Sequence, residues 1–563
     1  MYKNQKPVHF FYSFIFVLTI VNLVQGYATE LILDESYYWY FSQHLSWGYF
    51  DHPPMVALLV KIGSVLFKGE LGIRFFASFL FSGTIILLWK LIDDPSKYKH
   101  IILFCLLTGS VALFNVYGFF MLPDTPLFFF AALFLWGYKQ FLHRQNWWVV
   151  IILSISMAGM MYSKYHAALF IILIILSNFK ILLKRKFWAA ILLAILLYAP
   201  HLNWLYETDF VSLRYHLVDR ADSQYKLNFT LDYLASFFGI MGVAFPLIYW
   251  AFLKHKTQNS FDNALKYLVY GVFIFFLFSS FNRRTQAQWP VLVSIPLIII
   301  AFSYAIHHKK FKKWLVITSS ISLIAILFLR FALVYEQVSP ITYETHGNKK
   351  WVKELYQQTK GLPVVFKNSY SDATMYSFYS GVDIFSFNGI HFRENQFDID
   401  SSEYKFQHKK VAFLSYSKDA DSVIKVIRNY KERKWKGVFI DDFISWRKLK
   451  AQLKENDFKN YKDSISFTIN NPYNEDIAFE YLKFYGLTLN DKKRRVDTLA
   501  IDLSKKHSSG FIPAKSIVKV KAKLKELGKL EGEPFFRITI SENNMPFGFQ
   551  GNIINIETLR GNN

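Results

Sequence analysis

Three acidic residues stand where a carboxylate could take part in a reaction. Asp34 and Glu35 directly follow the first apolar segment, and Asp124 lies between Pro123 and Pro126 just before another apolar segment. A carboxylate at a membrane rim is costly unless it is hydrated, paired or used. Within hydrogen-bond reach of an acceptor hydroxyl it can act as a general base. We predict that all three are catalytic, with helix capping as the alternative for each. One could serve an acceptor while another holds a second ligand or a cationic partner.

Five cations are candidates for binding a phosphate group. Guanidinium and ammonium groups bind phosphoryl oxygens through charge-assisted hydrogen bonds. Snorkelling from the ends of apolar spans to lipid headgroups is the alternative. The candidates are Lys61, Arg74, Lys164, Arg283 and Arg284.

Five further polar aromatic side chains are candidate substrate contacts: Tyr38, His52, Tyr165, His166 and His201. The spacing of the histidines matches no metal-binding motif. Interfacial histidines and a membrane-interface belt of tyrosine and tryptophan are the alternative.

The stretch from Asp34 to Pro54 should position the first of these residues. Its acidic and short polar beginning is typical of a helix start, where such side chains satisfy free backbone amides and suit the positive end of the helix dipole. From Tyr37 to Leu45 apolar residues recur at helical spacing, as in a helix that lies flat at an interface. Pro54 can then open a second helix through Phe67. We expect two surface helices, with Asp34 and Glu35 at a membrane-facing cleft.

Composition indicates a polytopic membrane protein with a soluble remainder, since 52% of the 563 residues are hydrophobic and 19% are aromatic. The net charge of +23 lies largely in loops between apolar segments, where lysines act as orientation signals. Nucleic-acid binding is disfavoured, because no zinc-ligand spacing, Walker-type loop or RNA-binding aromatic motif is present. The single cysteine, Cys105, can form no internal disulfide.

Hydropathy predicts about eleven membrane crossings. The first could instead be the core of a signal peptide, but the polytopic chain behind it favours a retained anchor. The predicted spans are Phe10–Val24, Ile73–Trp89, Ile101–Val116, Pro126–Leu142, Trp148–Met161, Ala167–Phe179, Phe187–Leu202, Tyr233–Phe252, Leu265–Phe281, Trp289–Ile306 and Trp314–Val334.

Basic residues fall in every second connection between these spans, and we therefore expect those loops to be cytoplasmic. The unusual polar clusters fall in the opposite, extracytoplasmic loops, including the long segment Asn203–Asp232. The cytoplasmic set is Lys3, Lys6, Lys90, Lys97, Lys99, Lys139, Arg144, Lys180, Lys184, Arg185, Lys186, Lys254, Lys256, Lys309, Lys310, Lys312 and Lys313.

After Val334 the pattern changes to that of soluble domains. PVVFK, VAFLS and GVFI read as short buried strands, alternating with helical stretches at Asp372–Tyr379 and Asp419–Tyr430. ISFTI, VDTLAID, SIVKVKAKL and FFRITI then alternate as in a small β-sandwich. We predict a transmembrane domain at 1–335 with interfacial helices at 34–67, an extracytoplasmic α/β domain at 336–460, and a β-sandwich-like domain at 461–563.

The chain resembles the protein O-mannosyltransferase and aminoarabinose (lipid A) transferase superfamily of C-type glycosyltransferases. The resemblance rests on DESYYW, GYFDHPPM, GIRFFAS, LPDTPL, YSKYHAAL and APHLNW, in the family's order. It covers roughly Asp34 to Trp204, and beyond this range only the architecture agrees.

The resemblance implies a C-type glycosyltransferase fold in the bacterial inner membrane, with the active site on the outer face. It implies a polyprenyl-phosphate-sugar donor, such as undecaprenyl phosphate, and inversion at the anomeric carbon. Asp34 matches the catalytic aspartate, Glu35 its neighbour, Asp124 the second-loop acid and Lys164 the SKY motif, whereas Arg283 and Arg284 match by topology alone. No metal is strictly required, although the acid cluster could hold a divalent ion.

The acceptor stays open among lipid A or another envelope glycolipid, a glycan and a protein. A phosphate acceptor needs no base, so Asp34 would position or stabilise it, whereas a hydroxyl acceptor would make Asp34 the base. Two other function classes compete. A transporter or flippase of a lipid-linked sugar predicts ionisable residues deep within spans and broken helices in paired halves. A non-catalytic envelope protein predicts that Asp34→Ala leaves function intact.

Overall fold

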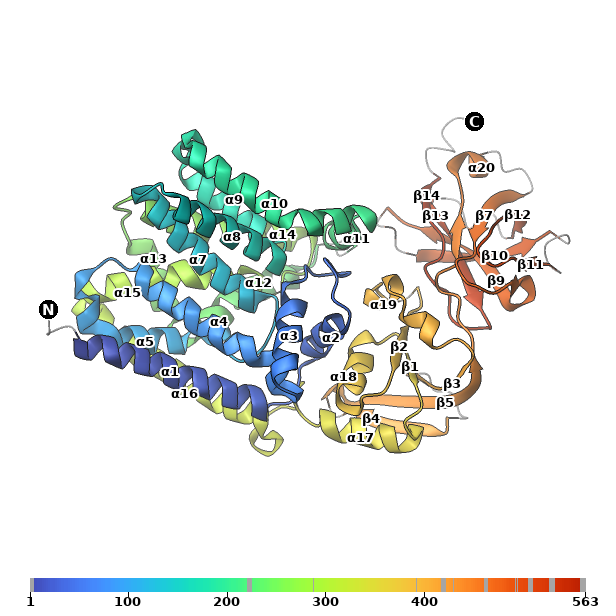
Figure 1. The fold of residues 1–563 in the computed structure, drawn as a ribbon, viewed down its shortest axis with the longest axis horizontal. Coiled ribbons are helices and arrows are strands. Elements are labelled where there is room, and N and C mark those ends of the chain that lie inside the picture. The colour runs from blue at the N-terminus through green and yellow to red at the C-terminus, as the bar shows by residue number, and fades with distance from the viewer. Residues whose placement is uncertain are drawn as a thin grey trace. The chain divides into compact units, whose positions relative to one another are not determined.

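The computed structural model describes residues 5–219, 225–286, 288–390, 392–416, 422–428, 430–459, 464–491, 493, 495–504, 510–525 and 532–556. Lys3 and part of the predicted outer segment Asn203–Asp232 lie outside these ranges. The chain divides into two compact units: a helical unit (1–349 with 429–431) and a C-terminal unit (350–428 with 432–563) (Figure 1).

The helical unit contains sixteen α-helices among the described residues. They are α1 (Gln5–Ala28), α2 (Leu33–Gln43), α3 (Met55–Leu66), α4 (Gly69–Leu91), α5 (Ile101–Ser110), α6 (Ala112–Val116), α7 (Asp124–His143), α8 (Trp147–Ser163), α9 (Ala167–Ser177), α10 (Arg185–Glu207), α11 (Val211–Arg214), α12 (Leu227–Met241), α13 (Phe245–Lys254), α14 (Ser260–Asn282), α15 (Ser294–His307) and α16 (Lys309–Val334).

Each predicted span falls on one or more of these helices, and the third is broken at Val111 into α5 and α6. Seven helical stretches of the described chain are long and apolar enough to cross a membrane, and α3, α8 and α9 are shorter apolar helices. The seven are Pro7–Ala28, Gly69–Leu91, Arg185–Glu207, Leu227–Lys254, Ser260–Asn282, Trp289–His307 and Lys309–Val334.

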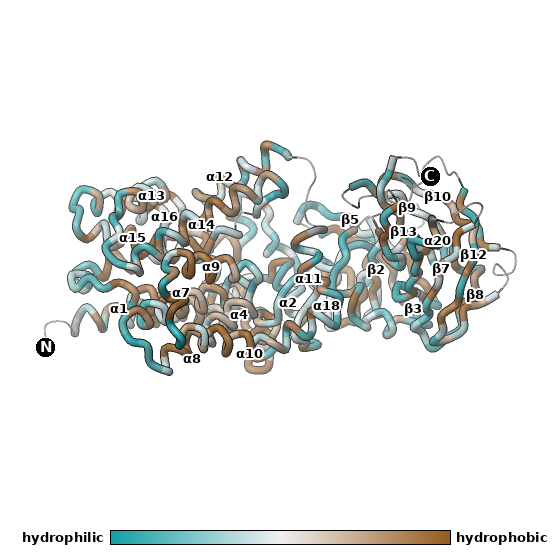
Figure 2. Tube along the Cα trace, turned by 90° about the horizontal axis from the view of Figure 1, so that it is seen from above, coloured by the Kyte–Doolittle hydropathy of each residue, from teal (hydrophilic) through white to brown (hydrophobic). Residues whose placement is uncertain are grey.

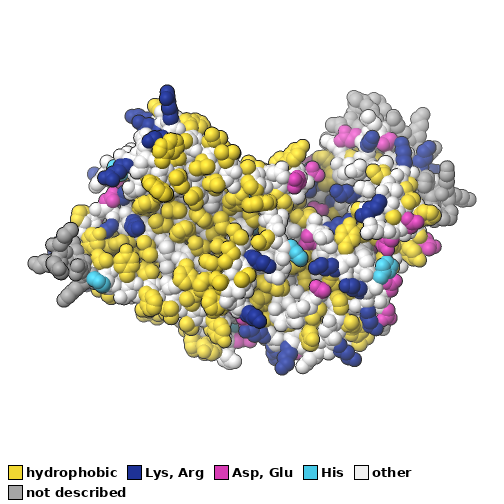
Figure 3. All heavy atoms as spheres, in the orientation of Figure 1, with side chains coloured by type: hydrophobic (Ala, Val, Ile, Leu, Met, Phe, Trp, Pro, Cys, Tyr) yellow, Lys and Arg dark blue, Asp and Glu magenta, His cyan; other side chains and the backbone are white. Residues whose placement is uncertain are grey.

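The helical unit exposes large apolar side chains, as expected for a surface that faces lipid. Phe16 on α1 and Ile324 on α16 are each 68% exposed. Apolar residues run along the helices in Figure 2, and hydrophobic side chains cover much of the unit's visible face in Figure 3. The prediction of a multi-pass membrane protein is confirmed.

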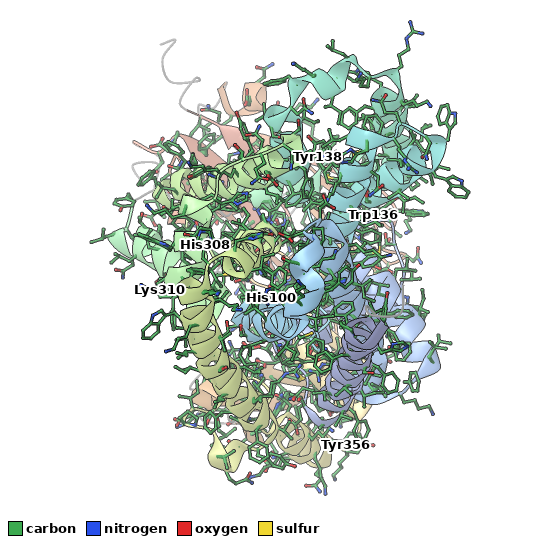
Figure 4. The ribbon with its side chains drawn as sticks, turned by 90° about the vertical axis from the view of Figure 1, so that its left-hand side faces the viewer. His100, Trp136, Tyr138, His308, Lys310 and Tyr356 are labelled. Atoms are coloured by element: carbon green, nitrogen blue, oxygen red, sulfur yellow. The ribbon has the colours of Figure 1, made fainter. Side chains whose placement is uncertain are left out.

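Two lysines donate hydrogen bonds to carbonyls at the C-terminal end of α4, the end that was predicted to be cytoplasmic. Lys97 Nζ donates to the carbonyl oxygens of Trp89 (2.9 Å) and Ile92 (2.5 Å). Lys139 Nζ donates to the carbonyl of Leu91 (2.6 Å). These contacts satisfy carbonyls that have no partner within the helix and suit the negative end of its dipole. Figure 4 looks onto this end of the unit, where His100, His308 and Lys310 are labelled.

The C-terminal unit contains a five-stranded sheet in the order β2-β1-β3-β5-β4, in which β1 is parallel to β2 and β3 and the remaining pairs are antiparallel. Its strands are β1 (Val364–Lys367), β2 (Ile384–Phe387), β3 (Lys409–Ser415), β4 (Ile424–Arg428) and β5 (Arg433–Phe443), accompanied by α17 (Asn348–Thr359), α18 (Tyr370–Ser380) and α19 (Gln396–Ile399).

A seven-stranded antiparallel sheet follows, in the order β14-β13-β9-β10-β12-β7-β6, with a two-stranded sheet β11-β8. Their strands, together with α20 (Glu455–Lys459), are β6 (Lys450–Gln452), β7 (Ile465–Asn470), β8 (Ile477–Ala478), β9 (Leu482–Leu489), β10 (Arg495–Leu503), β11 (Phe511–Ile512), β12 (Ile517–Leu524), β13 (Phe535–Glu542) and β14 (Ile553–Asn555).

The predicted strands and the predicted helix at Asp372–Tyr379 are confirmed, but the helix at Asp419–Tyr430 is wrong where the structure describes it. Residues 424–428 form strand β4, paired antiparallel with β5. Ile424, Val426 and Arg428 are buried while Lys425 and Ile427 are exposed, which is the period of a strand. The seven-stranded sheet also takes in β6, which precedes the predicted boundary at 460. The two-domain division of this region stays a prediction.

Candidate active site

The first turn of α2 is fixed by a buried ion pair between Glu35 and Arg74. Their side chains are 0% and 1% exposed, and Arg74 Nη2 lies 2.5 Å from Glu35 Oε2. Arg74 Nε donates to Glu35 Oε1 at 2.8 Å. This fork-to-carboxylate arrangement is the strongest hydrogen-bonding geometry that the two groups can form.

Arg74 has no N–H left for a ligand. A guanidinium carries five N–H donors, and here two bond Glu35. The other three donate to the backbone carbonyls of Gly26 (3.0 Å), Thr29 (2.5 Å) and Glu30 (3.0 Å). The predicted phosphate contact of Arg74 therefore does not fit the structure.

Glu35 is likewise fully engaged. Besides Arg74, it accepts from the backbone N–H of Ile32 (3.3 Å) and of Met121 (3.0 Å). The predicted catalytic role of Glu35 does not fit this burial, because no acceptor oxygen faces solvent. The bond to Met121 instead ties α2 to the segment that leads into α7, so Glu35 positions Asp124 relative to Asp34.

Asp34 is the exposed neighbour on the same turn. Asp124 begins α7, and both of its oxygens accept from Lys164 Nζ at 2.8 Å. The side chains of Lys164 and Asp124 are 12% and 6% exposed. A second carboxylate was predicted to hold either a second ligand or a cationic partner. In the structure Asp124 holds the cationic partner, Lys164.

Tyr117 has a buried hydroxyl whose titration is affected by both carboxylates. Its side chain is 2% exposed, and it lies just beyond α6. Burial raises the pKa of its hydroxyl well above 10.0, and the carboxylates of Asp124 and then of Asp34 raise it further. We call Asp34, Tyr117, Asp124 and Lys164 the carboxylate cluster.

The loop at 44–54 is held by side chains from three other segments. Tyr38 and His52 lie 3.2 Å apart, Oη to Nε2. His201 Nδ1 lies 2.6 Å from the carbonyl oxygen of Trp47, which can only accept, so Nδ1 carries the proton. In the neutral ring Nε2 then accepts from the Tyr165 hydroxyl at 3.1 Å. Four of the predicted substrate contacts therefore lie in this loop or in the residues packed against it.

The remaining predicted residues are more scattered. Arg283 donates to the carbonyl of His216 at 2.5 Å. Arg284 is 73% exposed and pairs with Asp232 at 3.0 Å. His166 packs against Trp289, with ring centroids 5.2 Å apart. Lys61 is half-buried on α3, and no hydrogen bond or ion pair within the described ranges joins it to the carboxylate cluster.

Sequence reasoning missed three residues of this region. Tyr117 has no motif around it. His216 Nε2 lies 2.8 Å from the Asp51 carbonyl oxygen, and its ring centroid lies 5.7 Å from that of Tyr165. Burial, and then the charges of Glu344, Tyr430 and Asp34, raise the pKa of the Tyr343 hydroxyl. Only contacts distant in sequence identify them.

Within the described residues, no group of three or more His, Cys, Asp or Glu side chains is arranged to hold a metal ion. The expected dispensability of a metal stays a prediction.

Comparison with known proteins agrees with this architecture. Residues 51–204 match a family described as dolichyl-phosphate-mannose-protein mannosyltransferase. The chain is 25% identical over 342 residues to the lipid A galacturonosyltransferase RgtD of Rhizobium johnstonii (strain DSM 114642 / LMG 32736 / 3841), covering 57% of this chain and 70% of RgtD.

Two crystal structures of ArnT from Cupriavidus metallidurans are also similar. The apo structure superposes with a TM-score of 0.56 at 13% identity, covering 77% of this chain and 98% of ArnT. The structure bound to undecaprenyl phosphate gives 0.55 at 13% identity, covering 75% and 97%. The fold is that of the C-type glycosyltransferases.

These comparisons support the resemblance to the C-type glycosyltransferase superfamily. The matched range 51–204 contains Asp124, Lys164, Tyr165, His166 and His201. Asp34 precedes that range and is joined to it through Glu35, Arg74 and Met121. The comparisons support a glycosyltransferase, whose donor and acceptor are taken up next.

Proposed function

We propose that this protein is an inverting glycosyltransferase that moves a sugar from a polyprenyl phosphate to a lipid A-type glycolipid on the extracytoplasmic face of the bacterial inner membrane. The observation that carries the proposal is the pair of Asp124 and Lys164, together with the contacts of Glu35 to Arg74 and Met121 that tie the helix turn bearing Asp34 to the segment before Asp124. The relatives support the substrate classes, since RgtD is named for lipid A and ArnT was crystallised with undecaprenyl phosphate.

Lys164 is suited to bind the leaving phosphate. An ammonium group has three N–H donors, and the two oxygens of Asp124 take two of them at 2.8 Å. The third can meet a phosphoryl oxygen. As the bond between the anomeric carbon and the phosphate oxygen breaks, charge grows on the phosphate and Lys164 stabilises it. Asp124 holds the ammonium group in place.

Asp34 is suited to receive a proton from the acceptor. When the acceptor is a hydroxyl, its oxygen attacks the anomeric carbon from the face opposite the phosphate and its proton passes to Asp34. The configuration inverts, and polyprenyl phosphate leaves. When the acceptor is a phosphate oxygen, no proton needs to be removed, and Asp34 orients the acceptor instead.

Transfer from synthetic undecaprenyl-phosphate sugars to lipid A tests the proposal. Wild type is compared with Asp34→Asn and Lys164→Ala, with chelator present and absent, on phosphorylated and dephosphorylated lipid A. The matched control is Asp262→Asn, which removes another acidic side chain from a helix first turn, that of α14. Donor binding is measured separately, so that binding and transfer are distinguished.

We expect Asp34→Asn to bind donor normally and to lose about 10²–10⁴-fold in transfer to a hydroxyl. Lys164→Ala should weaken donor binding as well as transfer, and Asp262→Asn should match wild type. If Asp34→Asn transfers normally to phosphorylated lipid A alone, a phosphate acceptor and an orienting Asp34 are indicated. If the wild type binds no polyprenyl-phosphate sugar, the transferase proposal fails.

A further inference from the structure

An arginine lies inside the apolar helix α16. The helix has 26 residues, which is about 39 Å at 1.5 Å per residue, compared with about 30 Å for the hydrocarbon core of a bilayer. Arg330 stands four residues before the last residue, Val334, or about 6 Å along the axis. This places Arg330 close to one boundary between hydrocarbon and headgroups, the outer one in the predicted orientation.

The guanidinium of Arg330 is buried against α1 and the segment before α7. Arg330 is 6% exposed and Asn22 is 0% exposed. Arg330 Nη2 donates to Asn22 Oδ1, and its guanidinium carbon lies 4.5 Å from the centroid of the Phe119 ring. Within the described chain, Arg330 Nε and Asn22 Nδ2 are buried donors with no acceptor.

Arg330 also differs in charge balance from three other cations of the helical unit. Arg74, Lys139 and Lys164 each lie within 2.8 Å of a carboxylate oxygen. Lys97 donates to two carbonyls. Arg330 forms no ion pair with any residue that the structure describes. An isolated buried charge is costly, and water satisfies an N–H without neutralising the cation.

The surroundings of Arg330 suit a lipid. Leu327 and Phe331, three residues before and one residue after Arg330 on α16, are each 52% exposed, and Val24 on α1 is 60% exposed. An acyl or prenyl chain can lie along these side chains while its phosphate accepts from the guanidinium. Phosphate is the group that arginine binds with several parallel hydrogen bonds while compensating its charge.

We propose that Arg330 and Asn22 form a binding site for the phosphate headgroup of a membrane lipid at the seam of α1 and α16. The site is distinct from the carboxylate cluster, because Asn22 lies on α1 and Arg330 on α16, helices that carry none of the cluster's residues. The Phe119 ring under Arg330 is 4.6 Å from that of Phe120, which in turn lies 4.8 Å from the Arg74 guanidinium. A lipid held there would brace the segment that carries Asp124.

Native mass spectrometry of the detergent-solubilised full chain tests the site. The protein is titrated with phosphatidylglycerol, with undecaprenyl phosphate, with diacylglycerol of matched chains, and with inorganic phosphate. The variants are Arg330→Gln, Arg330→Lys and, as matched control, Lys313→Gln, which removes a cation from the other end of the same helix. Lys164→Ala marks the proposed donor site.

We expect wild type to bind phosphatidylglycerol at least about tenfold more tightly than diacylglycerol, since hydrogen bonds to charged groups are worth that much in affinity. Arg330→Gln should lose this preference, Arg330→Lys should keep part of it, and Lys313→Gln and Lys164→Ala should retain it. Undecaprenyl phosphate binding to the wild type should show two sites, of which Arg330→Gln removes one and Lys164→Ala the other.

The proposal is overturned if wild type binds diacylglycerol as tightly as phosphatidylglycerol, a comparison that needs no variant to fold. Equal lipid binding by Arg330→Gln and Lys313→Gln also overturns it, as does loss of all phosphate-dependent binding in Lys164→Ala. Inorganic phosphate binding as tightly as the lipids would refute a lipid ligand. Because no turnover is measured, these results are independent of the proposed transferase activity.

Discussion

The ion pair between Glu35 and Arg74 makes a prediction that separates a structural carboxylate from a catalytic one. Replacing Arg74 with Met leaves the Glu35 carboxylate buried at 0% exposure without its cation. Replacing Glu35 with Leu leaves the buried guanidinium of Arg74 without its carboxylate. Each single variant should be strongly destabilised, whereas the double variant Glu35→Leu/Arg74→Met removes both charges together.

The magnitude follows from burial and from the number of bonds lost. Breaking a buried ion pair by removing one partner costs about 3–5 kcal/mol, because the remaining charge is uncompensated. Glu35→Leu also orphans the backbone N–H of Met121, which now donates at 3.0 Å, for about 1–3 kcal/mol. Since apolar replacement of a whole buried pair is often near neutral, the double variant should cost less than the sum of the single ones.

The assay is denaturant titration of the purified protein in mixed micelles, giving the free energy of unfolding of wild type, the two single variants and the double variant. The control is Arg284→Met, which breaks the 3.0 Å pair with Asp232 on the surface, where the side chains are 73% and 45% exposed. An exposed pair is worth about 0–1 kcal/mol, so this variant should stay near wild type.

The reasoning is refuted if Arg74→Met is no more destabilising than Arg284→Met, or if the double variant costs as much as the sum of the single variants. A further refutation would come from Glu35→Gln protein that unfolds like wild type but has lost all transfer. That outcome would restore a catalytic role for Glu35.

Three other perturbations test separate parts of the structure. Burial, and then the charge of Glu394, raise the pKa of Asp398 from 3.8 to about 7. Because the folded protein then binds a proton that the unfolded chain has released, stability should fall as pH rises from about 4 to about 7; Asp398→Asn should flatten this decline in the melting temperature. Gly48→Ala should destabilise by about 1–3 kcal/mol in the same denaturant titration, since its Cβ would meet Trp204 at 2.2 Å, and a neutral result would contradict the packing. Tyr117→Phe should lower transfer about tenfold or more at unchanged donor binding, and normal transfer would remove Tyr117 from the site.

Much of the helical unit follows from local sequence properties. A run of about 20 apolar residues must be buried in lipid with its backbone bonded internally, so the spans and the clusters between them were predictable. Asp124 and Lys164 were predicted as site residues from their motifs, but nothing local indicated that they bond each other, because they lie 40 residues apart.

Local pattern was weaker in the C-terminal unit. The stretch around β4 reads as a helix from its composition, yet its pairing with β5 and its alternating burial fix it as a strand. Strand preference depends strongly on cross-strand neighbours, which a single sequence does not reveal.

The contrast between Asp34 and Glu35 shows which conclusions the sequence alone could not supply. By itself the sequence determined that two carboxylates stand at the start of a helix beside a membrane span, because capping and hydropathy are local. Only the tertiary structure decided their roles. Successive helical residues point about 100° apart, so one side chain faces outward while the other enters the core, where Arg74 and Met121 take all its bonding capacity. Those partners are distant in sequence, and only folding brings them together.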